Sequence, residues 1–252
     1  MSKLALSLPL LSLLLGMVPA RPAPAKTADF PRGRLLEHVA SLSDPGQGYA
    51  LFLPSAYDPA RLWPILYCFD PGGRGRTPVA LFQDAAEKYG WILVGSNNSR
   101  NGPWEEIFRA VKAFWTDSHA RLAIDPERIY ACGFSGGARV ASGLRFIVNR
   151  PVAGVILCGA GLPSWLFPQL LKKTAVFAIV GRLDYNYEEM MELDGDLDDT
   201  ETPHWLEVFA GKHAWPPREL LSQALAWLEA LAEQPGRQDL KRHGNERRAS
   251  KE

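Results

Sequence analysis

The turn Gly133-Phe134-Ser135-Gly136-Gly137 carries the strongest structural signal in this chain of 252 residues. An apolar run, residues 128–132, precedes it, and a stretch of small residues, 138–144, follows it and can continue as a helix. A strand, a sharp turn and a helix in this order hold a serine at the apex with its hydroxyl above the sheet, and the flanking glycines prevent Cβ collisions. The pattern is typical of a nucleophile elbow. Because a five-residue motif is weak evidence alone, its context and its partners have to support it.

Apolar runs alternate with helix-like segments over most of the chain. Runs such as 64–69 and 91–95 are continuously apolar, as in strands that are buried on both faces. The expected strands are residues 35–39, 48–54, 64–69, 91–95, 128–132, 152–158, 175–180 and 205–209, and the expected helices are 78–89, 104–122, a helix after Ser135, 165–172, 187–199 and 217–231. These crossovers predict an α/β fold, a mostly parallel eight-stranded sheet with helices on both faces and functional loops at the carboxyl ends of the strands.

The two ends of the chain differ from this central domain, residues 35–232. Residues 1–25 have a secretory signal pattern, in which Lys3 precedes an apolar run that small-residue cleavage sites follow. The run is shorter than the roughly 20 residues of a membrane span, which favours a cleaved signal and a secreted or periplasmic protein over an uncleaved anchor. Residues 26–34 are expected to be a linker. The charged tail, residues 233–252, has almost no apolar residues and is expected to be disordered.

Charge and cysteine content exclude several classes of partner. Lys plus Arg and Asp plus Glu both number 28, so the chain has no broad basic field, and nucleic acid is excluded as a partner. The three cysteines, Cys68, Cys132 and Cys158, fall in or at the end of apolar runs, which predicts buried thiols rather than a disulfide framework. A bond between Cys68 and Cys132 remains open, as does the oligomeric state.

A serine hydroxyl is a weak nucleophile that needs a base and an acid that orients the base. Two candidates lie just after later strands, in the chain order expected for this topology: Asp184 after the strand that ends at Val180, and His213 after the strand that ends at Phe209. We therefore predict Ser135, Asp184 and His213 as a catalytic triad. The alternatives are that His213 is an ordinary loop histidine, or that Asp184 only caps a turn and a later acid completes the triad.

The anion that develops on a substrate carbonyl needs preorganised hydrogen-bond donors. The backbone N–H of Gly136, directly after the nucleophile, is the first expected donor. The second is expected from Gly72 or Gly73 in the loop after the third strand, unless Asp70-Pro71-Gly72-Gly73 is only a tight turn.

Loop residues at strand ends are candidates for contact with substrate. Asn98, Asn101 and Trp104 follow the fourth strand and Trp215 follows His213, but polar loop residues and a core tryptophan are equally ordinary interpretations. The aspartates at 194, 196 and 198 imitate the start of a calcium loop. Its sixth and twelfth positions do not fit, and no metal site is expected.

Residues 125–137, 181–184 and 211–216 resemble the α/β-hydrolase superfamily, and within it secreted esterases similar to feruloyl esterases and polyhydroxybutyrate depolymerases. The resemblance covers about residues 35 to 232. It implies an eight-stranded hydrolase core, Ser135 as nucleophile, His213 as general base, Asp184 as its orienting acid, and no cofactor. Many relatives have His-Gly where this chain has Asp70-Pro71, and no long insertion follows the sixth strand, which suggests an open site.

The expected activity is that of a secreted serine hydrolase that cleaves carboxylic esters, small or polymeric, through an acyl-enzyme. A serine peptidase on the same fold has the same triad and stays an alternative. A non-catalytic binding protein that kept the fold is a further alternative, although such a protein has no need of three ordered catalytic residues. The sequence does not name the ester.

Overall fold

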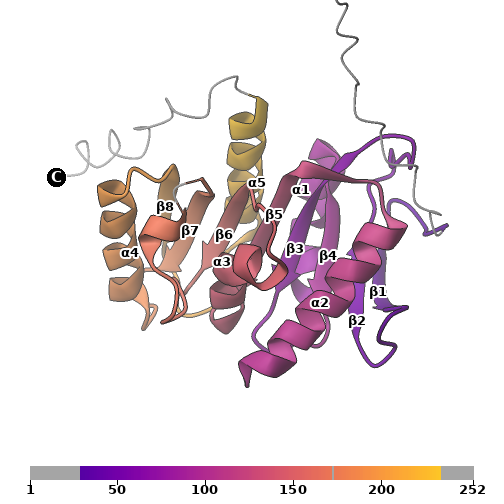
Figure 1. Cartoon of the computed structure of the whole chain (residues 1–252). Coiled ribbons are helices and arrows are strands. Elements are labelled where there is room, and N and C mark those ends of the chain that lie inside the picture. Colours follow the sequence, from indigo (N-terminus) through magenta and orange to yellow (C-terminus); the bar gives the residue numbers. More distant parts are fainter. Residues whose placement is uncertain (1–28, 172, 234–252) are drawn as a thin grey trace, which may run out of the picture.

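The apolar runs of the sequence form one eight-stranded sheet, with strand order β1-β2-β4-β3-β5-β6-β7-β8 (Figure 1). The computed structural model describes residues 29–171 and 173–233, so the expected signal segment and nearly all of the expected tail lie outside the described residues. The strands are β1 (Leu35–Ala40), β2 (Gly48–Phe52), β3 (Trp63–Phe69), β4 (Ile92–Ser96), β5 (Ile124–Phe134), β6 (Gly154–Cys158), β7 (Ala175–Gly181) and β8 (His204–Phe209). The predicted fold class is confirmed.

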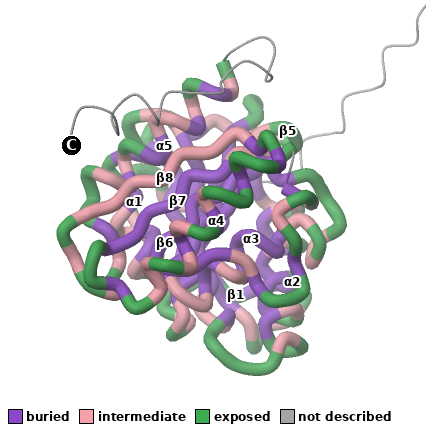
Figure 2. The backbone as a smooth tube through the Cα atoms, turned by 90° about the vertical axis from the view of Figure 1, so that its left-hand side faces the viewer, coloured by how far each residue is buried: buried purple, intermediate pink, exposed green. Residues whose placement is uncertain are grey.

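Strands β3 to β8 pair in parallel, whereas β1 and β2 pair antiparallel at one edge of the sheet. In parallel strands the carboxyl ends share one edge, so the loops after β3, β4, β5, β6, β7 and β8 are collected there. The central strands are buried throughout, as Figure 2 shows by the purple tube inside the molecule.

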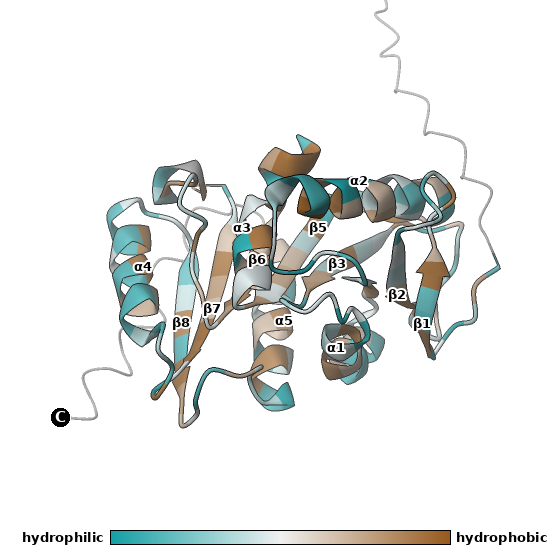
Figure 3. Ribbon diagram, turned by 90° about the horizontal axis from the view of Figure 1, so that it is seen from below, coloured by the Kyte–Doolittle hydropathy of each residue, from teal (hydrophilic) through white to brown (hydrophobic). Residues whose placement is uncertain are grey.

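The helices cover the sheet in two layers, each with its own apolar core. Helices α1 (Arg76–Tyr89) and α5 (Arg218–Glu233) pack on one face, and α2 (Trp104–Arg121), α3 (Gly136–Val148) and α4 (Tyr187–Asp199) pack on the other. Figure 3 shows α1 and α5 on the opposite side of the sheet from α2. None of the described helices is both long and apolar enough to cross a bilayer.

Three details differ from the expectations. The helix expected at 165–172 is only a 3-10 turn, η1 (Pro168–Leu171), because Pro168 is tolerated in a first turn but disfavours the helical conformation for Phe167 before it. Strand β5 begins at Ile124, four residues before the expected start at residue 128, and the pairing register with β3 shifts in this added part. The last helix continues to Glu233.

The predicted buried thiols are confirmed: Cys68, Cys132 and Cys158 are free and fully buried. Cys68 and Cys132 are register partners on the adjacent strands β3 and β5. Burial, together with the neighbouring Cys68, raises the pKa of the Cys132 thiol well above its ordinary value.

Candidate active site

Ser135 occupies a strained turn between β5 and α3. Its φ of 54° and ψ of −124° lie in a region that residues other than glycine rarely adopt. The turn is closed by the Ser135 N–H, which donates to the Cys158 carbonyl at 2.8 Å. Glycine is required beside it, since a Cβ on Gly133 would lie 2.1 Å from the Gly137 carbonyl oxygen and one on Gly137 would lie 2.2 Å from that of Phe69. The sharp turn lifts the serine hydroxyl to the carboxyl edge of the sheet.

The structure brings Ser135, His213 and Asp184 into one hydrogen-bonded chain. His213 Nε2 lies 2.9 Å from Ser135 Oγ, and His213 Nδ1 lies 2.8 and 2.9 Å from the two carboxylate oxygens of Asp184. A carboxylate only accepts hydrogen bonds, so His213 Nδ1 carries a hydrogen atom and donates a hydrogen bond to Asp184. Nε2 is therefore left with a lone pair toward the serine hydroxyl, which is the tautomer that a general base needs.

Asp184 is held in place from the loop after β7. Its side chain is only 1% exposed, and its Oδ1 also accepts the Asn186 N–H at 2.8 Å. The Asn186 carboxamide in turn donates to the Gly159 carbonyl after β6, at 2.8 Å. Among the acids of α4, Glu189 pairs with Arg139 on the neighbouring helix, and Asp194 and Asp198 lie close to His204. Asp184 is therefore the acid that reaches His213 within the described part of the chain.

Aromatic rings enclose the imidazole of His213 on two sides. The ring of Phe134 lies 4.6 Å from it and the ring of Tyr185 lies 4.1 Å from it, measured between centroids. Phe134 is buried, but Tyr185 is 76% exposed. Tyr185 is therefore an exposed aromatic ring in contact with His213. In the sequence, only the position of Tyr185 directly after Asp184 indicates this contact.

The two expected sources of oxyanion donors differ in the structure. The Gly136 N–H is the first amide of α3, and the first amides of a helix have no partner within it. Gly72 and Gly73, in contrast, both donate to Asp70: the Gly73 N–H to its carbonyl and the Gly72 N–H to its carboxylate, each at 2.9 Å. The segment is thus a tight turn around Asp70, in which both amides already have an acceptor.

Asp70 joins this turn to the histidine loop. Its fully buried carboxylate accepts two hydrogen bonds from Arg74, at 2.8 and 3.1 Å, and one from Trp215 Nε1 at 3.0 Å. Burial alone would raise the pKa of Asp70, but these donors and the Gly72 N–H outweigh it and hold the pKa below its usual value. Trp215, a predicted pocket residue, therefore links Asp70 to the loop that carries His213, and its ring packs on Phe134.

The two predicted asparagines of the loop after β4, Asn98 and Asn101, lie in different surroundings. The Asn98 carboxamide accepts the Gly48 N–H at 2.8 Å and so holds the loop to β2, away from the triad. Asn101 lies at the site: its N–H donates to the Pro71 carbonyl at 2.8 Å, and its carboxamide rests on Gly136. Trp104, at the start of α2, lines a neighbouring cavity.

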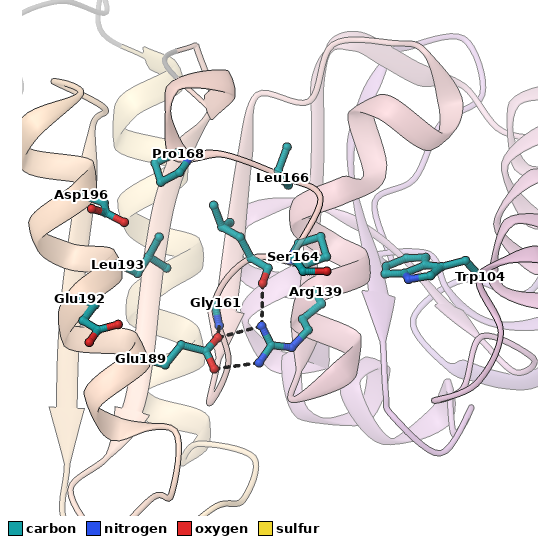
Figure 4. A pocket seen from close by; sticks show the side chains of 12 residues that line it. Trp104, Arg139, Gly161, Ser164, Leu166, Pro168, Glu189, Glu192, Leu193 and Asp196 are labelled. Atoms are coloured by element: carbon teal, nitrogen blue, oxygen red, sulfur yellow. Dashed lines mark hydrogen bonds and ion pairs between the residues drawn. The ribbon is translucent and has the colours of Figure 1, made fainter.

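This cavity has a volume of about 580 Å³ and lies between α4, the end of α3 nearest Ser135, and the loop after β6 (Figure 4). Its lining does not include the triad, but Arg139 is one helical turn after Ser135. Arg139 donates to both carboxylate oxygens of Glu189 at 2.8 Å and to the Leu162 carbonyl at 2.6 Å. Although burial opposes it, this pairing lowers the pKa of Glu189. The cavity is therefore lined by the Arg139–Glu189 pair, by the further acids Glu192 and Asp196, and by apolar residues such as Trp104 and Leu193.

No family model matches the sequence, and no curated protein matches it either. Solved structures do match. S-formylglutathione hydrolase (FrmB) from Staphylococcus aureus is similar with a TM-score of 0.61 at 13% identity, over 80% of this chain and 99% of that one. A ferulic acid esterase gives 0.62 at 16% identity, over 79% and 98%. A truncated carbohydrate esterase from gut microbiota gives 0.62 at 12% identity, over 81% and 99%. The chain therefore has the α/β-hydrolase fold, as the resemblance implied.

Proposed function

We propose that the protein is a serine hydrolase that cleaves carboxylic esters through an acyl-enzyme. The observation that carries the proposal is the continuous hydrogen-bonded chain from Ser135 through His213 to the buried Asp184. The similar solved structures are described as esterases or hydrolases, which agrees with this chemistry. The N-terminal sequence pattern supports export, so we further propose a secreted or periplasmic enzyme.

In the first half-reaction, Ser135 Oγ attacks the ester carbonyl while His213 Nε2 takes its proton. The carbonyl π bond opens, and the oxygen becomes an anion that the Gly136 N–H stabilises. When the tetrahedral intermediate collapses, the carbon–oxygen bond to the alcohol breaks, and His213 returns the proton to the leaving alcohol. Asp184 holds the imidazole and stabilises its protonated form throughout.

In the second half-reaction, water replaces the alcohol. His213 Nε2 removes a proton from the water, whose oxygen attacks the acyl carbonyl, and the same anion forms again. Collapse breaks the bond to Ser135 Oγ, which takes the proton back from His213 and releases the carboxylic acid. The cavity beside Arg139 is suited to hold one arm of the ester, because it begins one helical turn from the nucleophile and apolar residues such as Trp104 and Leu193 form part of its lining.

A fluorophosphonate probe tests the nucleophile, because it reacts covalently with an activated serine. We expect wild-type protein to be labelled and to hydrolyse short p-nitrophenyl esters, and we expect Ser135→Ala to lose both activities. Ser142→Ala is a matched control, since this serine lies on α3 but donates to the Arg139 carbonyl instead of joining the triad. A folded wild-type protein that takes up no probe would reject the enzyme. Hydrolysis of peptide amides in preference to esters would indicate a peptidase instead.

A further inference from the structure

The proposed mechanism leaves one donor to be found. Two hydrogen bonds to the oxyanion are the usual requirement of acyl transfer, and each is worth about 100- to 1,000-fold in rate. The Gly136 N–H supplies one of them. The N–H groups of Gly72 and Gly73 are both engaged by Asp70, which is itself held by Arg74 and by Trp215 from a distant loop. Releasing either amide would break the turn.

The carboxamide of Asn101 lies directly on Gly136. A Cβ built on Gly136 would be 1.8 Å from Asn101 Oδ1, 2.8 Å from its Cγ and 3.2 Å from its Nδ2. These distances mean that the carboxamide occupies the space that any side chain at Gly136 would fill. The group therefore sits against the same residue whose N–H is the first donor.

The backbone of Asn101 is fixed, whereas its side chain is not. The Asn101 N–H donates to the Pro71 carbonyl, and the neighbouring Arg100 forms an antiparallel bridge with Gly72. The residue is exposed, and within residues 29–171 and 173–233 its carboxamide has no hydrogen-bond partner. Rotation about its Cβ–Cγ bond exchanges Oδ1 and Nδ2 without breaking any hydrogen bond in this part of the chain. The NH₂ group is thus free to turn toward a charge that forms beside Gly136.

We infer that Asn101 is a catalytic residue whose side-chain NH₂ donates the second hydrogen bond to the oxyanion. This inference rests on the proposed function and names the group that completes it. It also fits the turn around Asp70, which engages the Gly72 and Gly73 amides and whose Pro71 carbonyl accepts the N–H of Asn101. The carboxamide is uncharged, so it can donate to the oxyanion without placing a fixed charge beside a neutral ester.

The test compares Asn101→Ala and Asn101→Asp with wild type in the hydrolysis of p-nitrophenyl acetate and in the rate of fluorophosphonate labelling. In Asn101→Ala, kcat should fall about 100- to 1,000-fold while KM stays within about twofold, because the bond forms mainly in the transition state. Asn101→Asp keeps the shape of the side chain but replaces the donor by a carboxylate. It should be slower than the alanine variant, since the carboxylate repels the oxyanion.

Arg100→Ala is the matched control, because it changes an exposed side chain in the same loop and should leave kcat near the wild-type value. Thermal unfolding verifies that each variant is folded. If the wild type is active and kcat falls less than about threefold in either Asn101 variant, the inference is overturned while the esterase proposal stands. Equal losses in Ala and Asp that fall mainly on KM overturn it as well, since they indicate a structural role. An unreactive wild-type protein would overturn the proposed function itself.

Discussion

Gly136→Ala is the perturbation that most directly probes the contact between the elbow and Asn101. The new methyl group would lie 1.8 Å from Asn101 Oδ1, a distance that no side chain tolerates. Because the obstructing atom is the end of an exposed side chain, the carboxamide can rotate away, and the fold survives. The catalytic geometry does not survive. We expect kcat to fall about 100-fold, equivalent to about 2.7 kcal/mol of transition-state stabilisation, with little change in the free energy of unfolding.

A double-mutant cycle decides whether this loss passes through Asn101. In an Asn101→Ala background the carboxamide is gone, the methyl group has space, and Gly136→Ala should cost almost nothing further, which gives a coupling energy of about 2.7 kcal/mol. The assay is p-nitrophenyl ester hydrolysis under saturating substrate, with chemical denaturation as the stability check. A double variant that is another 100-fold slower than Asn101→Ala would refute the reasoning, because the two changes would then act independently.

Gly137→Ala is the matched control for the same cycle. Its methyl group would lie 2.2 Å from the backbone oxygen of Phe69 in β3, which cannot rotate away. We expect this variant to lose stability, by at least the 1 to 3 kcal/mol that is typical of overpacking, whatever residue occupies position 101. Substitution of Gly136 should therefore lower kcat, whereas substitution of Gly137 should lower the free energy of unfolding.

Three further predictions follow from the site and its surroundings. Asp184→Asn should lower kcat about 10,000-fold in ester hydrolysis because it loses the acceptor that fixes the tautomer of His213, whereas Asp194→Asn should leave kcat unchanged; equal activity in the first variant would reject the assignment. Burial opposes protonation of His204, but Asp194, 3.3 Å away, and its other partners raise the pKa above its ordinary 6.5. Protonated His204 therefore stabilises the fold below about pH 6.5, and this contribution is lost as the pH rises through the raised pKa. In urea unfolding, the difference in the free energy of unfolding between wild type and His204→Asn should therefore shrink from about pH 5 to about pH 9. Trp215→Phe keeps the ring but removes the hydrogen bond to buried Asp70, and denaturation should detect a loss of about 1.5 to 3 kcal/mol; no loss would mean that the link is not structural.

The fold could be predicted from the sequence because the apolar patterns that indicate strands and helices are local and periodic. Continuous apolar runs bounded by turn residues, such as residues 64–69, predict buried strands wherever they occur, and alternation with helices predicts parallel pairing. The prediction of a helix at 165–172 was wrong because Pro168 disfavours the helical conformation for the residue before it, so only the short turn that begins at Pro168 forms.

The triad candidates were readable for a related reason. In a parallel sheet, a residue just after a strand lies at the carboxyl edge, so chain order alone brings Ser135, Asp184 and His213 to one region. The side toward which an amide points is not readable in this way. The N–H groups of Gly72 and Gly73 are directed by Asp70, whose position depends on Trp215, 145 residues later in the chain.

The roles of the two asparagines in the loop after β4 could not be predicted from the sequence either. Asn98 and Asn101 are three residues apart in a polar loop, and no property of the sequence separates them. Their surroundings differ only through tertiary contacts, which place one beside Gly48 in β2 and the other on Gly136. Side-chain roles that depend on a partner far along the chain become visible only when the fold is known.

The three buried thiols affect how long the protein stays native as well as how it folds. Cys68, Cys132 and Cys158 are free and lie inside three neighbouring strands, so the chain can reach its native state without an oxidation step. In the oxidising surroundings proposed for it, the same thiols become reactive as soon as the sheet opens, and wrong disulfides then compete with refolding. Inactivation would then be irreversible, and the working lifetime would follow the rate at which the sheet opens rather than the free energy of unfolding. The rate at which the native protein takes up a thiol reagent measures the rate of opening.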